Sequence, residues 1–102
     1  MDKGRFNAAG FDATQSIINA NDALTIYFLG KRPSMDHREA VRLHVDVVRV
    51  LNDSSCRDIV KNALEMRSEF GYLGTATNEK EARKLVFSAI KFLSWVKSKI
   101  QK

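Results

Sequence analysis

Residues 63–75 read Ala-Leu-Glu-Met-Arg-Ser-Glu-Phe-Gly-Tyr-Leu-Gly-Thr and connect the last two helical patterns of the chain. Apolar residues recur at helical spacing as far as Phe70, and two glycines then interrupt the pattern, so a helix is expected to end here. Arg67 falls on the apolar side of that helix, between Ala63 and Phe70. Because burial of an unpaired charge is costly, we expect Arg67 either to reach solvent from the edge of this side or to meet an acid or anionic ligand.

Working outward, apolar residues at three- and four-residue steps predict four helices, near residues 12–29, 36–52, 55–71 and 78–100. Three of the four begin with a capping-box pattern, at Asp36 and Glu39, Ser55 and Asp58, and Asn78 and Glu81. The second segment is rich in valine, so a strand is the alternative there. Short connections favour antiparallel neighbours. We therefore expect an all-α, antiparallel up-down bundle of four main helices.

The chain has 102 residues, which predicts a single domain covering residues 1–102. Gly4 and Gly10 weaken any helix near the start, so residues 1–11 are expected to be loosely ordered or to form a short turn. One cysteine, Cys56, excludes an intrachain disulfide framework and favours the cytoplasm. No apolar run is long enough to span a membrane, so no membrane association is expected.

Positive charge gathers at the end of the chain. From Arg83 onward there are six basic residues and no acidic one. Cations in the last turns of a helix complement the helix dipole and favour solubility. The alternative is a basic face for RNA or a nucleotide.

The last helix carries more apolar residues than one face requires. Its expected core stripe consists of Ala82, Leu85, Val86, Ala89, Leu93, Val96 and Ile100. Phe87, Phe92 and Trp95 widen the apolar arc beyond that stripe. These three aromatic residues are expected either to pack against the N-terminal residues or to form a homodimer face.

The histidines and the cysteine do not form a metal pattern. His37 and His44 are separated by seven positions and no Cys-x-x-Cys or His-Glu-x-x-His motif occurs, so neither a metal nor another cofactor is expected. His44 faces the apolar side of the second helix, where a neutral core histidine with one hydrogen-bond partner is typical and a titrating active-site residue is the alternative. His37 either caps the second helix or borders a site. Cys56 is expected to be a buried structural residue.

Polar residues interrupt the first helix. Asn19, Asn21 and Asp22 lie in its middle, where helix propensity does not favour them. They are expected to be solvated or, alternatively, to contribute to a polar site. In that second case Asp22 is the acid expected to pair with Arg67, because a bundle brings the first and third helices within reach.

The order of several elements resembles the HEPN-domain family. Ala23–Gly30 is an alanine-containing helix that ends in Phe-Leu-Gly, and Lys31–His37 reads Lys-Arg-Pro-x-x-x-His. Arg67–Tyr72 reads Arg-x-x-x-x-Tyr, and Glu81–Leu93 reads Glu-Ala-x-x-x-Val-x-x-Ala-x-x-Phe-Leu. The resemblance covers roughly residues 12–100.

The resemblance implies a helical bundle that often forms dimers. Many members of the family are RNases, often toxins encoded beside a nucleotidyltransferase-type antitoxin, and others are binding modules without activity. The catalytic signature of the family is an arginine and a histidine with four to six residues between them. Arg67 matches the arginine, but Tyr72 stands where the histidine would be, and tyrosine is a poor proton carrier near neutral pH. Arg38 and His44 have the right spacing but lie one helix too early.

The sequence therefore predicts a HEPN-like module without catalysis that binds a nucleotide, RNA or a protein partner such as a nucleotidyltransferase-type antitoxin. A metal-independent RNase that uses Arg67, with Tyr72 or His44 as proton carrier, is the first alternative. A purely structural interaction bundle is the second. A ligand site, if present, is expected around Arg67 and Tyr72, with further neighbours His37, His44, Asn21 and Asp22.

Overall fold

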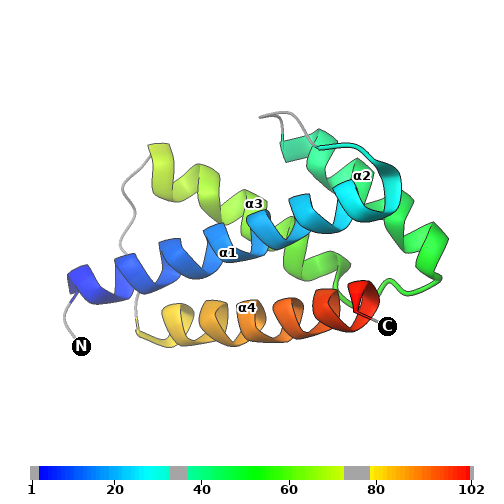
Figure 1. The fold of residues 1–102 in the computed structure, drawn as a ribbon. Coiled ribbons are helices and arrows are strands. Elements are labelled where there is room, and N and C mark those ends of the chain that lie inside the picture. The colour runs from blue at the N-terminus through cyan, green and yellow to red at the C-terminus, as the bar shows by residue number, and fades with distance from the viewer. Residues whose placement is uncertain (1–2, 33–36, 73–78, 102) are drawn as a thin grey trace.

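The computed structural model describes residues 3–32, 37–72 and 79–101, with side chains for residues 8–32, 38–66 and 79–101. This part of the chain contains four helices and no strand (Figure 1). The helices are α1 (Lys3–Leu29), α2 (His37–Leu51), α3 (Arg57–Tyr72) and α4 (Glu79–Ile100). The predicted all-α bundle of four main helices is confirmed, and the valine-rich segment is a helix. The capping residues predicted at positions 36 and 78 lie outside the described residues.

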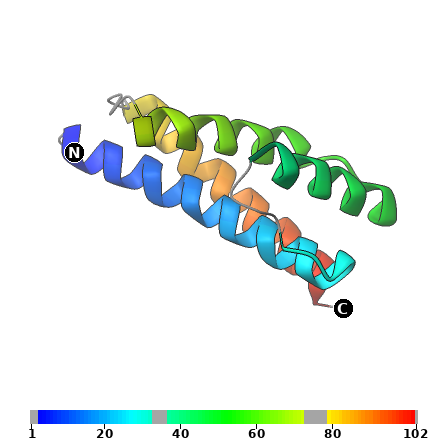
Figure 2. The same cartoon turned by 90° about the horizontal axis from the view of Figure 1, so that it is seen from above.

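The first helix is longer than the sequence predicted. It begins at Lys3 instead of near Asp12, so the prediction of a loose segment was wrong for residues 3–11. Gly4 is the second residue of α1, and Gly10 lies in its interior, where glycine costs about 1 kcal/mol relative to alanine. Gly10 is buried, and the first turns of α1 run beside α4 in both views (Figures 1 and 2). Tertiary packing therefore extends the helix against its local propensity.

The helix directions differ from a strictly up-down order. Figures 1 and 2 show α1 and α4 side by side and running in the same direction, with α3 running against both. In both views α2 also runs in the direction of α1. Helix α1 packs against all three other helices.

Residues in the left-handed backbone conformation end both α1 and α2. Gly30 has φ 66° and its N–H donates to the Ile26 carbonyl at 2.9 Å, which ends α1 in the left-handed conformation that glycine favours. Asn52 has φ 54°, and the Asp53 N–H donates to the Val48 carbonyl at 3.3 Å. This is the pattern of a Schellman motif at the end of α2. It holds Asp53 directly after the helix.

The core lies where α1 meets the other helices. Its largest fully buried apolar side chains are Phe92, Ile17, Leu24, Val47 and Val60. On α4 the predicted stripe was correct for Ala82, Ala89 and Val96 but wrong for Val86 and Leu93, which are 38% and 43% exposed. Phe92 occupies the core in their place, since α4 turns a different edge of its broad apolar arc toward α1 and α2.

Among the described residues, none of the helices combines the length and the apolar character needed to cross a bilayer.

Candidate functional site

A buried hydrogen bond joins two of the predicted site residues, Asn21 on α1 and His44 on α2. His44 Nδ1 lies 2.9 Å from Asn21 Oδ1, and each residue is 1% exposed. A carbonyl oxygen can only accept, so Nδ1 carries the proton in this arrangement and Nε2 carries the lone pair of a neutral ring. The sequence prediction of a core histidine with one partner is confirmed, and the partner is a residue 23 positions earlier.

The surroundings of His44 keep its ring neutral. The rings of Phe92 and Trp95 lie 6.1 and 6.0 Å from it, centroid to centroid. Burial, and to a smaller extent the charge of Arg57, together lower the pKa of His44 from 6.5 to about 4. Within the described part of the chain, His44 Nε2 is buried and has no hydrogen-bond partner. The ring therefore has a basic nitrogen but no path to a solvent-borne substrate.

The polar side chains of α1 form a buried row beside this pair. Thr14, Asn21 and Thr25 are each 1% exposed or less, and their spacing places them on one side of the helix. Thr25 Oγ1 donates to the Asp22 carbonyl at 3.0 Å. Among described groups, Thr14 Oγ1 has no partner. Asn21 is therefore buried and bonded, while Asn19 is exposed, as a solvated residue would be, and the prediction of a ligand site at Asn21 stays a prediction.

Other predicted site residues cannot be brought into this arrangement. Asp22 is half-buried on α1, one position after Asn21. The side chains of Arg67, Tyr72 and His37 lie outside the described residues, although the backbone positions of all three belong to α2 or α3. The expected pairing of Arg67 with Asp22 therefore stays a prediction.

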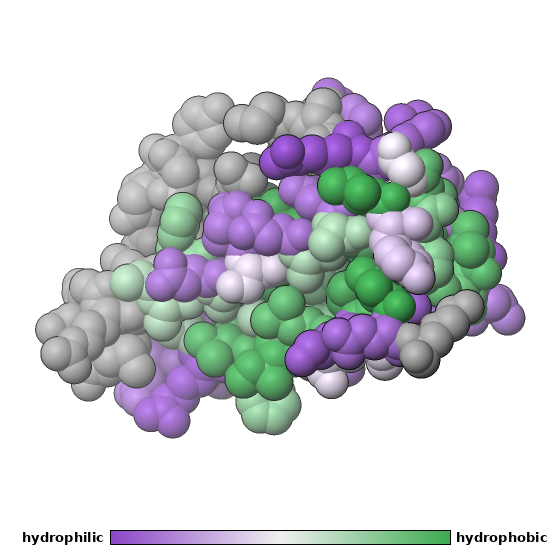
Figure 3. Space-filling model, viewed as in Figure 1, coloured by the Kyte–Doolittle hydropathy of each residue, from purple (hydrophilic) through white to green (hydrophobic). Residues whose placement is uncertain are grey.

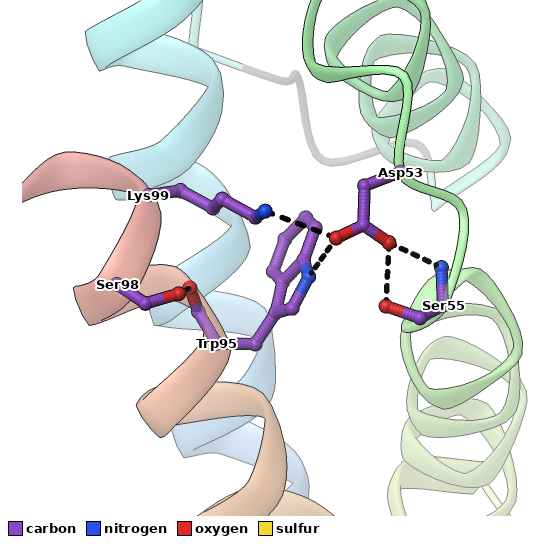
Figure 4. A network of polar contacts seen from close by, with 5 residues as sticks. All are labelled: Asp53, Ser55, Trp95, Ser98 and Lys99. Carbon is purple, nitrogen blue, oxygen red and sulfur yellow. Dashed lines mark hydrogen bonds and ion pairs between the residues drawn. The ribbon is translucent and has the colours of Figure 1, made fainter.

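A second polar cluster, which sequence reasoning missed, is centred on Asp53 in the turn after α2 (Figure 4). Asp53 Oδ1 accepts from the Ser55 N–H at 3.0 Å and from Ser55 Oγ at 2.6 Å. Asp53 Oδ2 accepts from Trp95 Nε1 at 3.0 Å and pairs with Lys99 Nζ at 3.0 Å. The carboxylate thus ties the α2–α3 turn to the end of α4.

These contacts change two sequence-based predictions. The Ser55 hydroxyl was expected to cap α3, but it donates to Asp53. Trp95 was expected to widen an exposed aromatic surface, but it is half-buried and donates to the same carboxylate. The hydrogen bonds from Ser55, and then those from Trp95 and Lys99, hold the pKa of Asp53 well below its ordinary value. A buried indole N–H needs an acceptor, which is the one sequence signal that could have indicated such a partner.

Cys56 is a buried thiol that lies next to the Asp53 cluster. Cys56 is 1% exposed at the start of α3, and burial raises the pKa of its thiol. A buried thiol with a raised pKa is a weak nucleophile. The predicted structural role of Cys56 is therefore confirmed. Among the described residues, no group of three or more His, Cys, Asp or Glu side chains is placed to hold a metal ion.

A shallow groove of about 370 Å³ lies between α2 and α3. Its lining consists of Arg38 and Val41 from α2 and Lys61, Leu64 and Glu65 from α3. Two cations flank an apolar floor, but one carboxylate lies beside them. An anionic group bound in the groove would be attracted by Arg38 and Lys61 and repelled by Glu65.

Four exposed apolar side chains lie close together on α4. We define the α4 face as Val86, Phe87, Ile90 and Leu93, whose exposed fractions are 38%, 76%, 62% and 43%. Figure 3 shows apolar side chains gathered along this side of the molecule between polar ones. Four exposed cations on the same helix border the α4 face: Arg83, Lys84, Lys91 and Lys97.

The α4 face corrects the aromatic prediction. Of the three aromatic residues expected either to pack against the N-terminal residues or to form a homodimer face, Phe87 is exposed at 76%. Phe92 is fully buried and packs against Trp95 with ring centroids 5.8 Å apart. Phe92 and Trp95 therefore belong to the core and its edge. The exposed apolar partners of Phe87 are aliphatic residues that sequence reasoning had assigned to the core or had not singled out.

No protein-family model matches this chain, and neither a curated protein nor a solved structure shows significant similarity to it. The resemblance to the HEPN-domain family therefore stays a prediction that rests on the motifs of the sequence.

Proposed function

We propose that this protein is a HEPN-like helical binding module without catalytic activity, and that it uses the α4 face to bind another protein chain. The observation that supports this proposal is the exposure of four neighbouring apolar side chains on one helix. Contiguous exposed apolar surface of this kind is costly in water and marks interaction sites in soluble proteins. Both predicted associations, a homodimer and a nucleotidyltransferase-type partner protein, would use this surface.

The state of His44 supports a module without catalysis. A general base must reach the proton that it removes, and an efficient one has a pKa near the working pH. His44 is buried beneath Phe92 and Trp95, and its pKa is lowered to about 4. The RNase alternative would then depend on Arg67 and Tyr72 alone, and tyrosine is a weak proton carrier at neutral pH.

The groove between α2 and α3 is the observation that favours a second candidate function, binding of RNA or a nucleotide. Arg38 and Lys61 border it, and α3 continues from it toward Arg67. A phosphate would find cations there, but Glu65 opposes an anion. We therefore rank nucleotide binding below protein binding.

Photocrosslinking in the native cell tests the proposed function. A benzophenone amino acid replaces Phe87 in one variant and Val50, an equally apolar residue 63% exposed on α2, in the control. We expect a discrete crosslinked product from position 87, either a second copy or another protein, and none from position 50. Equal, diffuse products from both positions would contradict the proposal. An RNase assay with the purified chain tests the absence of catalysis, and turnover abolished by Arg67→Ala would overturn it.

A further inference from the structure

The charges around the α4 face indicate which kind of chain covers it. Arg83 lies one turn before Phe87, and Lys97 lies one turn after Leu93, so a cation stands at each end of the face. Lys84 and Lys91 lie one turn before and after Phe87 along its other side. All four cations are exposed. A partner that binds the α4 face therefore contacts an apolar stripe with positive charge at both ends and along one edge.

Acidic residues that could balance these cations are scarce on α4. Glu79 and Glu81 are the only acids of the helix, and both lie in its first turn. Glu79 is already paired with Arg83, with Arg83 Nη2 2.7 Å from Glu79 Oε1. No acidic residue follows Glu81 in the sequence. The positive border is therefore complementary to a partner that carries negative charge.

A second copy that pairs through its own α4 does not supply that charge. In an antiparallel two-fold pairing of α4 with itself, centred on Ile90, residues equally far from Ile90 face each other. Arg83 of one copy then faces Lys97 of the other, and the reciprocal pair repeats the repulsion. Like charges placed opposite each other weaken an interface and select against that pairing.

The spacing of the apolar residues matches a helical partner. Val86, Ile90 and Leu93 follow one another at four and three residues, and Phe87 lies beside them. Such a stripe interlocks with the apolar stripe of another helix, as in helix-on-helix packing. Charged residues at the borders of such a pairing set the choice of partner.

We infer that the partner of the α4 face is an acidic amphipathic helix of another protein, with its apolar side on Phe87 and Ile90 and its carboxylates opposite Lys84, Lys91 and Lys97. This inference rests on the proposed function, because it requires that the α4 face bind a protein. It goes further by fixing the charge and the secondary structure of that protein.

Two synthetic helical peptides of about 20 residues, long enough to cover the face, test the inference. Both carry the same leucine stripe, and glutamates border the stripe in one peptide while lysines border it in the other. Fluorescence anisotropy measures their affinities for the full-length protein. We expect the glutamate peptide to bind at least about tenfold more tightly and to weaken as salt is raised. The variant Lys84→Glu/Lys91→Glu should reverse the preference.

Matched variants locate the binding. Phe87→Ser/Ile90→Ser should weaken the glutamate peptide by about tenfold or more, since truncation of central anchors removes most of an interface's affinity. Val50→Ser, an apolar residue 63% exposed outside the α4 face, should leave the affinity unchanged. Circular dichroism checks that each variant is folded. Binding that survives Phe87→Ser/Ile90→Ser would overturn the inference, because the peptide would then occupy another surface.

The remaining outcomes separate this inference from the proposed function. Equal affinity for both peptides, lost in Phe87→Ser/Ile90→Ser, would overturn the acidic partner and leave protein binding by the α4 face intact. Light scattering that shows a wild-type dimer and a monomeric Phe87→Ser/Ile90→Ser variant would assign the face to a second copy and overturn the inference. A single-stranded oligoribonucleotide that binds the wild type and is lost in the same variant would overturn both proposals.

Discussion

Two polar contacts, Asn21–His44 and the Asp53 cluster, anchor α2 and its following turn to the rest of the bundle, and they do so in opposite ways. The first is a neutral pair at 2.9 Å, with both residues 1% exposed and one ring nitrogen left without a described partner. The second is a carboxylate near the surface, and both of its oxygens are in use. Solvent access therefore determines how much stability is lost when one partner of a polar contact is removed. Loss of a partner in a dry site leaves an unsatisfied group, whereas water replaces a partner at the surface.

The largest effect is expected from acid. Above pH 6.5 His44 is neutral in the folded and the unfolded chain, so its burial makes no pH-dependent contribution. As the pH falls from 6.5 toward 4, the unfolded chain binds a proton that the folded chain excludes, and stability is lost. With about 1.4 kcal/mol for each pKa unit, the loss reaches about 3 kcal/mol near pH 4.

Urea unfolding between pH 7 and 4 measures this loss. The matched control is His44→Leu, which has no group that titrates at position 44. Its stability should change much less over the same interval. A wild type as stable at pH 4.5 as at pH 7 would show that His44 is protonated, and therefore hydrated, within the folded chain.

The next effect is expected from Asn21→Leu. The substitution keeps the branched shape of the asparagine side chain, although leucine is larger, and it leaves the His44 Nδ1–H without its acceptor. An unsatisfied buried donor costs about 1–3 kcal/mol. Equilibrium unfolding at pH 7 measures the loss. The double variant Asn21→Leu/His44→Leu should be more stable than the sum of the two single changes predicts, because it leaves neither partner unpaired. Simple additivity would contradict a direct coupling.

Much of the fold could be predicted from the sequence because most helix ends depend on local chemistry. Gly30 and Asn52 terminate α1 and α2 through left-handed backbone conformations, which sequence patterns indicate well. The start of α1 could not be predicted, since Gly4 and Gly10 argue against a helix that only packing beside α4 stabilises. The direction of α2 also could not be predicted, because residues 30–36 are long enough to permit either orientation.

The candidate sites could be predicted only in part, because local patterns indicate single residues whereas tertiary packing decides which of them meet. His44 follows from its place on an apolar helix face, and Asn21 from its unfavourable place inside a helix. Their pairing is a tertiary contact across 23 positions that no local pattern fixes. Asp53 and Trp95 are 42 positions apart, and only the packing of α4 against the turn brings them together. The apolar arc of α4 is broad enough that either of its edges could face the core. Leu93 was therefore expected in the core stripe and Phe92 beyond it, and the structure shows the reverse.

The Asp53 cluster should show a smaller effect than Asn21→Leu. Asp53→Ala removes the acceptor of Trp95 Nε1 and of the Ser55 groups, but water can reach these donors from the surface. We expect a lowered Tm, less lowered than in Asn21→Leu, and still less in Lys99→Met, which removes only the ion pair.

The acid dependence of the Asp53 cluster also separates it from His44. The pKa of the Asp53 carboxyl lies below the ordinary value of 3.8. Its contribution to the free energy of unfolding is therefore present above pH 3.8 and is lost only as the pH falls below that value. Thermal unfolding at pH 7 and near pH 3 provides the measurement. An Asp53→Ala effect as large near pH 3 as at pH 7, or one larger than that of Asn21→Leu, would contradict the proposed difference between surface and buried contacts.

The smallest effect on stability is expected at the α4 face. Phe87 is 76% exposed and makes little use of its ring in the fold, so Phe87→Ser should change the free energy of unfolding by no more than about 0.5 kcal/mol. The control Val50→Ser, at an apolar residue of similar exposure on α2, should behave alike in unfolding experiments. The two variants should differ in association, because only Phe87 belongs to a contiguous apolar face. Thermal unfolding and sedimentation of both variants test this. A large destabilisation by Phe87→Ser would mean that the fold itself covers this side chain, and the α4 face would then be part of the core instead of a surface kept for a partner.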